Sequence, residues 1–348
     1  MVNNMAQQIL NNITLLKGNP TYKPIKYIWA EQAWSAQQQM HWIADEVPLQ
    51  DDVVDFSSKL TPEEKYFVTH VFRFFVQGDV EVCNSYTHNF LKVFEPMEIQ
   101  MMLTSFANAE TIHISGYARL LDTLGLPEIE YSAFKNYADM KKKYELLHSF
   151  NFNNQITEIT KTHIAKTMIL FGAFIEGVCL FGSFAMLAAF QNEGKLKGVG
   201  QIITWSARDE QLHAQSMIKL YHTFVEENYN DIDHNEIKSF ITEISDTIIS
   251  LETSFIEAAF QGKKDITIAG LTFDKVCDYV KYTVQQRTEQ LNQPLNFGIT
   301  ENPIPWMDSF LYLPEHVNFF ESRATEYTKG GLIGDMGFDN DDDFVKKN

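Results

Sequence analysis

The residues of this sequence with the clearest capacity for chemistry are two pairs of glutamate and histidine, each with the spacing Glu-x-x-His. One pair is Glu110 and His113, and the other is Glu210 and His213. Positions i and i+3 share one face of a helix, so each pair can present an oxygen and a nitrogen ligand to the same point. The spacing therefore indicates two ligand pairs on two separate helices.

Two single carboxylates lie in strongly apolar segments. Asp79 follows a run that contains three phenylalanines, and Glu176 lies among phenylalanine, isoleucine and valine. Burying an ionised carboxylate is unfavourable unless it is paired or binds a metal. Either residue alone could be a core carboxylate held by an arginine, but their combination with the two Glu-x-x-His pairs predicts a shared metal site.

The predicted ligands are Asp79, Glu110, His113, Glu176, Glu210 and His213. Four carboxylates neutralise two divalent cations, and a carboxylate with a Glu-x-x-His pair on facing helices is the ligand set of dinuclear carboxylate bundles. Carboxylate and imidazole ligands suit iron or manganese. A third copy of the pattern, Glu145 and His148, follows three consecutive lysines and is interpreted as a solvated surface pair.

Long helices must position these ligands. Glycine and proline are sparse, with 17 Gly and 10 Pro, and apolar residues recur at three- and four-residue intervals. Thr61, Pro62 and Glu64 form a capping box with proline at the first helical position. The pattern predicts an all-α bundle with four long helices, at residues 61–94, 96–124, 155–191 and 199–228, and shorter ones at 29–41, 128–147, 231–259 and 272–291.

The composition predicts three regions along the chain. Residues 1–22 form a polar, flexible N-terminus, residues 23–329 form one domain, and residues 330–348 form a flexible acidic tail rich in glycine.

Charge and composition also limit the partners. The net charge of −18 disfavours binding to nucleic acid. Three widely spaced cysteines and the lack of a visible secretory signal favour the cytoplasm. Residues 167–190 are long enough to span a bilayer, but Glu176 in their middle would be costly there, so we expect a buried bundle helix and no membrane association.

Through the types and spacing of these six ligands, the sequence resembles the small, radical-generating subunit of class I ribonucleotide reductase over about residues 25–345. The resemblance implies a ferritin-like bundle in which the six ligands bind a dinuclear centre, two iron ions per chain, with manganese or a mixed manganese/iron pair as alternatives. Reaction with dioxygen would oxidise Tyr117 to a stable radical. Tyr117 lies seven residues after Glu110 and four after His113, on the same helix face.

The resemblance also implies a path for the oxidising equivalent. Asp209 would accept a hydrogen bond from His113, and Trp42 would continue the path toward the surface. Tyr327, with Glu321 nearby, would pass the equivalent to a separate large subunit, which reduces ribonucleotides to deoxyribonucleotides. The family further implies a homodimer, and activation would need dioxygen and an electron donor.

Some positions depart from the family pattern. The residues expected to line Tyr117 include Leu180, Phe184 and the polar Ser206, and a basic end follows Phe344, the expected docking anchor of the tail. Asp79 and Tyr117 favour the di-iron, tyrosyl-radical type over relatives that use a manganese/iron pair.

Two other functions fit the ligand set. One is a di-metal oxidase or monooxygenase with its own substrate cavity, and the other is a non-enzymatic iron-binding bundle. Neither would use Trp42, Asp209 or Tyr327, so these residues favour the reductase subunit.

Overall fold

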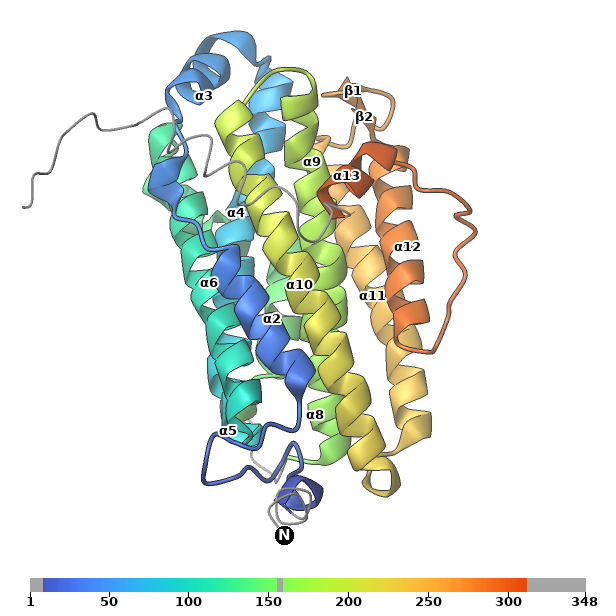
Figure 1. Cartoon of the computed structure of the whole chain (residues 1–348). Coiled ribbons are helices and arrows are strands. Elements are labelled where there is room, and N and C mark those ends of the chain that lie inside the picture. The colour runs from blue at the N-terminus through green and yellow to red at the C-terminus, as the bar shows by residue number, and fades with distance from the viewer. Residues whose placement is uncertain (1–8, 155–158, 312–348) are drawn as a thin grey trace, which may run out of the picture. The chain divides into compact units, whose positions relative to one another are not determined.

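The structure is a computed structural model that describes residues 9–154 and 159–311 (Figure 1). The α-helices after the first short N-terminal turn are α2 (Ile28–Gln39), α3 (Gln50–Val54), α4 (Pro62–Asn84), α5 (Leu91–Val93), α6 (Met97–Thr123), α7 (Ala138–Ser149), α8 (Lys161–Met168), α9 (Leu180–Asn192), α10 (Lys197–Glu227), α11 (His234–Ala259), α12 (Phe273–Gln290) and α13 (Asp308–Leu311). Two-residue strands, β1 (Thr267–Ile268) and β2 (Leu271–Thr272), form one antiparallel hairpin.

Short segments with other helical geometry join these α-helices. The π-helical segments are η2 (Asp55–Lys59), η3 (Ser85–Phe90) and η6 (Ile169–Cys179). The 3-10 segments are η1 (Ala44–Glu46), η4 (Glu128–Asn136), η5 (Phe152–Asn154), η7 (Tyr229–Asp231) and η8 (Pro305–Met307). Two of the π segments, η3 and η6, continue helices of the bundle without a break.

The long helices lie side by side along one axis (Figure 1). Helix α4 is followed by the antiparallel α6, α10 packs against η6 and α9, and α2 packs against α6 and α10. Helices α11 and α12 lie on the side of α9 and η6 away from α6. The predicted all-α bundle is confirmed.

The start of α4 agrees with its sequence signal. The Thr61 hydroxyl accepts the backbone N–H of Glu64 at 3.2 Å, and the Glu64 carboxylate accepts the N–H of Thr61 at 2.8 Å. The predicted capping box is confirmed, and it fixes where the helix carrying Asp79 begins.

The one described helix that is long and apolar enough to cross a membrane is buried. Residues Lys161–Asn192 are long and apolar enough to cross a membrane, but the apolar window within them is entirely buried inside the bundle. All of η6 and the first eleven residues of α9 are buried. The expected buried bundle helix is what the structure shows.

Two carboxylates, Asp52 of α3 and Asp55 of η2, cap the N-terminus of α10. Asp52 of α3 accepts the backbone N–H groups of Gly198 and Val199 at 3.0 and 2.9 Å. Asp55 accepts the N–H of Leu196 at 2.9 Å, and Leu196 has a left-handed backbone with φ of 47°. These bonds satisfy donors that a helix N-terminus leaves free, and they anchor the 31-residue helix that carries Glu210 and His213.

Two segments differ from the expectation. Residues 9–22 are not a loose extension, because Ile13 and Leu15 are buried and the Leu15 N–H donates to Glu227 at 2.8 Å. The predicted helix at 128–147 is a 3-10 segment followed by α7.

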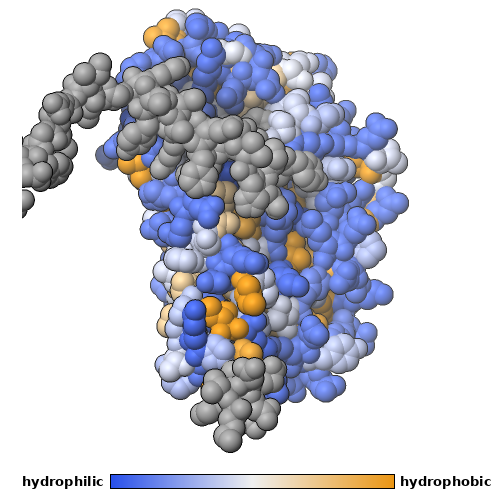
Figure 2. Space-filling model, in the orientation of Figure 1, coloured by the Kyte–Doolittle hydropathy of each residue, from blue (hydrophilic) through white to orange (hydrophobic). Residues whose placement is uncertain are grey.

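The face of the bundle seen in Figure 2 is largely hydrophilic, with small patches of apolar residues.

Candidate metal centre

The six predicted ligands come from four neighbouring elements and are fully buried. Asp79 lies on α4, Glu110 and His113 on α6, Glu176 on η6, and Glu210 and His213 on α10. The structure therefore brings all six together in the core.

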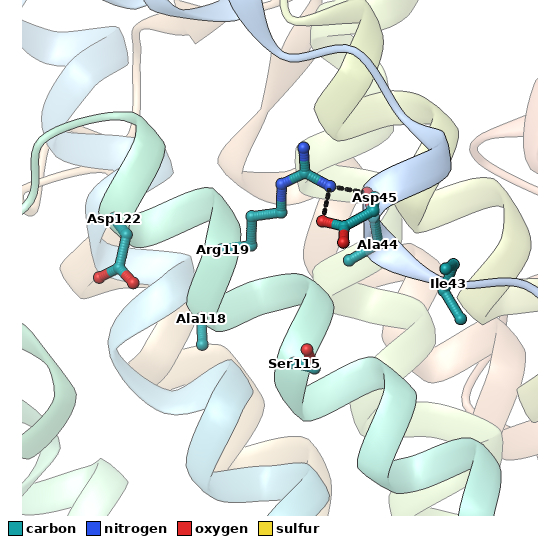
Figure 3. Close-up of a pocket in the computed structure, with 7 residues that line it drawn as sticks. All are labelled: Ile43, Ala44, Asp45, Ser115, Ala118, Arg119 and Asp122. Carbon is teal, nitrogen blue, oxygen red and sulfur yellow. Dashed lines mark hydrogen bonds and ion pairs between the residues drawn. The ribbon is translucent and has the colours of Figure 1, made fainter.

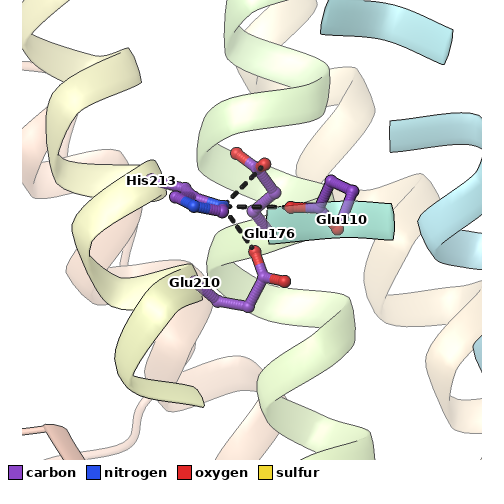
Figure 4. A group of neighbouring side chains, drawn as sticks. All are labelled: Glu110, Glu176, Glu210 and His213. Atoms are coloured by element: carbon purple, nitrogen blue, oxygen red, sulfur yellow. Dashed lines mark ion pairs between the residues drawn. The ribbon is translucent and has the colours of Figure 1, made fainter. Parts of the chain in front are cut away.

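One group of possible ligands surrounds His213 (Figure 4). Its Nδ1 atom lies 3.0 Å from Glu110 Oε1, 3.3 Å from Glu210 Oε2 and 3.6 Å from Glu176 Oε1. The four side chains converge on one point, where they offer three oxygens and one nitrogen.

A second group consists of Asp79, Glu110 and His113. His113 Nδ1 lies 3.4 Å from Glu110 Oε2 and 3.0 Å from Glu210 Oε1. Because Glu110 belongs to both groups and Glu210 reaches both histidines, the two groups form one continuous cluster. This is the geometry expected of two adjacent cation sites that share carboxylates.

The inward atoms of the cluster have unmet bonding capacity. Among the residues that the structure describes, no hydrogen-bond partner reaches either carboxylate oxygen of Asp79, Glu110 or Glu210, or the Nδ1 atoms of His113 and His213. Buried polar atoms are rarely left in this state without an ion or water. Hard oxygen ligands and imidazole nitrogens in this number fit two divalent cations such as iron or manganese.

The charges of the cluster perturb one another strongly. Burial disfavours the imidazolium forms, yet Glu110 and the neighbouring carboxylates raise the pKa of His113, and likewise of His213, well above the usual value. Burial raises the pKa of Glu176 to about 8, whereas the two histidines lower the pKa of Glu110 to about 2 against the effect of burial. The carboxylates and histidines of the cluster thus shift one another's pKa values in opposite directions.

Both histidines are oriented by a partner on their outer nitrogen. Nε2 of His113 lies 3.1 Å from Asp209 Oδ2, and the same oxygen accepts the indole N–H of Trp42 at 2.8 Å. The Trp42 ring also stacks on His113, with centroids 5.8 Å apart. Gly116 permits this approach, because a Cβ atom there would lie 3.3 Å from the indole. The structure connects Asp209 and Trp42 to the cluster through His113.

The partner of His213 is a residue that the sequence analysis missed. Nε2 of His213 lies 3.1 Å from Gln37 Oε1, and Gln37 is buried on α2. The sequence contains a pattern that could have identified Gln37: it lies four residues after Ala33 and seven after Ala30, on the same buried face of α2. A polar residue on that face points to an internal partner.

Tyr117 is buried next to the cluster on α6. Its ring centroid lies 6.3 Å from that of His113 and 4.4 Å from that of Phe75. Burial, followed by the charge of Asp79, raises the pKa of the Tyr117 phenol far above its usual value, and the neighbouring Ser206 hydroxyl acts in the opposite direction. Phe184, which was expected to line this site, contacts it through Phe75.

A second buried tyrosine, also missed, contacts the cluster directly. The Tyr86 hydroxyl donates a hydrogen bond to Glu176 Oε1 at 2.5 Å. Tyr86 follows Asp79 by seven residues, which is the spacing that separates Tyr117 from Glu110. The register argument that identifies Tyr117 would therefore have identified Tyr86 as well.

The third Glu-x-x-His copy behaves as predicted. Glu145 and His148 are exposed on α7, away from the cluster. The lysine run before them is not uniformly solvated, however, because Lys143 is buried and forms an ion pair with Glu252 of α11.

A surface hollow of about 550 Å³ lies between η1 and α6, close in sequence to Trp42 (Figure 3). Arg119 crosses it to the carbonyl of Ala44 and to Asp45 Oδ1, the latter at 2.7 Å. A much narrower crevice, with room for about one water molecule, is lined by Gln37, Trp42 and Asp209, among others. Trp42 therefore lies between His113 of the cluster and the surface at this crevice.

The remaining predicted residues lie outside the part of the chain that the structure describes. These are Glu321, Tyr327, Phe344 and the acidic tail at 330–348.

Comparisons with known proteins agree with this fold and cluster. The family described as ribonucleotide reductase, small chain, matches residues 20–303. A probable ribonucleoside-diphosphate reductase small subunit, 048L of Invertebrate iridescent virus 3, is 37% identical over 94% of this chain and 89% of its own length. The corresponding 376L protein of Invertebrate iridescent virus 6 is 36% identical over 92% of this chain and 97% of its own.

Solved structures share the fold at lower identity. The ribonucleotide reductase R2 subunit from Clostridium botulinum superposes with a TM-score of 0.77 at 19% identity, covering 86% of this chain and 94% of that one. The dimanganese(II) NrdF of Streptococcus sanguinis gives a TM-score of 0.70 at 16% identity, covering 84% and 99%.

The fold and the cluster define a ferritin-like carboxylate–histidine bundle, a class that contains oxidases and iron-binding proteins as well as reductase subunits. Within this class, the chain belongs to the family of ribonucleotide reductase small chains. It is a class I small subunit, so the resemblance drawn from its sequence is confirmed.

Proposed function

We propose that Asp79, Glu110, His113, Glu176, Glu210 and His213 hold two iron ions and that Tyr117 is the residue oxidised to a radical. The observation that supports this most directly is the continuous buried cluster, in which Glu110 is shared between two groups of ligands. Manganese, or a manganese/iron pair, is the alternative metal content, and one neighbour in structure is a dimanganese protein.

When bound, the metal pair would supply the oxidising power obtained from dioxygen, and an external electron donor would provide the remaining electron. Tyr117 would give up one electron and its phenolic proton. The phenolic proton would pass to a basic group of the cluster, where Asp79 is the carboxylate whose charge acts most strongly on the phenol. The apolar surroundings, which include Phe75 and Phe184, would keep water away from the oxidised ring.

The oxidising equivalent would leave through Asp209 and Trp42. His113, Asp209 and Trp42 form an unbroken series of contacts, with polar distances of 3.1 and 2.8 Å. Tyr327 would receive the equivalent and pass it to the large subunit of ribonucleoside-diphosphate reductase, which would reduce ribonucleotides to deoxyribonucleotides. We further propose a homodimer that acts in the cytoplasm.

Reconstitution with ferrous iron and dioxygen tests this function. We expect two irons per chain and a tyrosyl signal in the electron paramagnetic resonance spectrum of the wild-type protein. Tyr117→Phe keeps the ring but removes the oxidisable hydroxyl, so it should bind the same iron and show no long-lived tyrosyl signal. A signal of unchanged intensity would place the radical elsewhere, and Tyr86 would then be the first residue to replace.

A further inference from the structure

Tyr86 and Tyr117 lie on opposite sides of the cluster along the bundle axis. Each follows a cluster carboxylate by seven residues, Tyr86 on the continuation of α4 and Tyr117 on α6, and these two helices run antiparallel. Tyr86 packs edge-on against Phe106 and His213, and Tyr117 lies near His113. The function proposed above assigns a role to Tyr117 and none to Tyr86.

The two oxygens of Glu176 have different environments because of Tyr86. Oε1 accepts the Tyr86 hydroxyl at 2.5 Å, which is within the range of strong hydrogen bonds to a carboxylate. Among the described residues, no hydrogen-bond partner reaches Oε2. The carboxylate is therefore held at one end, and its rotation about the terminal bond is restricted.

The restriction has a direct consequence for ligation. A glutamate can bind a metal through one oxygen or through both. Oε1, which accepts the Tyr86 hydroxyl, is also the Glu176 oxygen that lies 3.6 Å from His213 Nδ1. Chelation would require the carboxylate to turn until Oε2 also faced the cluster, and that rotation would displace Oε1 from Tyr86. Tyr86 is 1% exposed, so water cannot readily replace the lost partner.

We propose that Tyr86 is a positioning residue that holds Glu176 as a one-oxygen ligand of the metal centre. This inference rests on the dinuclear site proposed above. Tyr86 is the second residue of the π-helical segment η3, and its hydroxyl reaches across to Glu176 of η6.

Another tyrosine of this chain provides a matched control. Tyr27 is also buried, and its hydroxyl donates to a glutamate, Glu227 Oε1, at 2.7 Å. Neither residue belongs to the cluster. Tyr27→Phe and Tyr86→Phe each remove one phenol-to-carboxylate hydrogen bond and keep the ring, but only the latter removes it from a predicted ligand.

The test is to load the wild-type protein and both variants with Mn(II) and determine their crystal structures, with Co(II) absorption spectra as a second measurement. We expect one Glu176 oxygen bonded to metal in the wild type and in Tyr27→Phe, and both oxygens bonded in Tyr86→Phe. The Co(II) spectrum should change in Tyr86→Phe alone, because the coordination number of one ion increases.

Metal counting separates the two possible failures. If the wild type bound fewer than two Mn(II) ions per chain, the proposed metal centre itself would be wrong. If it bound two and Glu176 already chelated through both oxygens, or if Tyr86→Phe retained the one-oxygen arrangement, only the role of Tyr86 would be wrong. Should Tyr86→Phe not fold, a metal-loaded wild-type structure in which the Tyr86 hydroxyl no longer contacts Glu176 would overturn this role.

Discussion

At the scale of single residues, the cluster combines charges that would be unfavourable without compensation. Its four carboxylates and two histidines are fully buried, and pKa values shift in both directions, with that of Glu176 raised to about 8 and that of Glu110 lowered to about 2. Such opposed shifts among neighbouring groups are typical of functional sites. They support the metal centre that we propose at this cluster.

Glu176→Gln tests the ligand set at minimal steric cost. The amide keeps the size of the side chain but removes the negative charge, so we expect clearly fewer than two metal ions per chain. Elemental analysis of the purified protein measures this. Glu227→Gln, which changes a carboxylate outside the cluster, should retain two, and full occupancy in Glu176→Gln would remove Glu176 from the ligands.

His70 should make stability depend on pH independently of the cluster. It is fully buried on α4 among Tyr66, Tyr137 and Phe255, and burial, with help from Arg73, lowers its pKa to about 3. An unfolded chain would bind a proton near pH 6.5, whereas the folded protein would not until about pH 3. The free energy of unfolding therefore falls as the pH falls through this window.

His70→Phe should remove that contribution. Between pH 7 and pH 5 we expect the variant to lose about 2 kcal/mol less stability than the wild type. Urea unfolding of the metal-free proteins at both pH values measures the difference. His148→Phe, at an exposed position of α7, is the control, and equal losses in the wild type and His70→Phe would contradict the prediction.

At the scale of elements, the N-terminus of α10 depends on Asp52. This carboxylate accepts two backbone N–H groups, and bonds of this kind to an ionised group contribute more than neutral ones. Asp52→Ala should lower the free energy of unfolding by about 2 kcal/mol. Urea titration checks this, and Asp51→Ala, at the exposed neighbouring position, should change it little.

Helix positions were largely predictable from the sequence, because regular burial imposes a regular pattern. The capping box at Thr61 places the start of α4 correctly, and the predicted helix at 199–228 corresponds to α10 at Lys197–Glu227. The π geometry of η3 and η6 was not predictable, since it depends on neighbouring helices. The hairpin of β1 and β2 is too short to leave a periodic signal, although Ala269 and Gly270 adopt the positive φ values that its turn requires.

The residues of the candidate site also fall into two sets, those that the sequence pattern reveals and those that it does not. The six ligands could be predicted because charged residues in apolar helices are conspicuous, and the structure brings these side chains together. Gln37 was missed because its role depends on how α2 packs against α10, which no local pattern reveals. Tyr86 was within reach of the same register argument as Tyr117. Lys143 shows the opposite error, since a lysine run predicts solvent exposure and the structure buries one member.

At the scale of the whole molecule, residues 330–348 are expected to bind the large subunit. They lie outside the described residues, so this prediction rests on their composition, in which Phe338 and Phe344 lie among acidic residues. Deleting them should weaken binding of a cognate large subunit without changing the metal content or the radical. Titration calorimetry measures the binding.

Tyr327→Phe should behave differently from that deletion. We expect normal metal loading, a normal radical and nearly intact binding, but no nucleotide reduction. Turnover assays with a cognate large subunit measure this effect. Normal turnover in both variants would contradict the exit path through Tyr327 and the docking role of the tail.

The burial of η6 and α9 has a consequence for the protein before it folds. Residues 167–190 emerge from the ribosome as a stretch with the length of a membrane span, and Glu176 is the one charged residue within it. A charge near the middle of such a stretch opposes insertion by the translocon by about 3 kcal/mol. The carboxylate that we assign to the metal centre thus also helps to keep the nascent chain out of the bilayer. Glu176→Ala would remove this charge and would favour mislocalisation during synthesis.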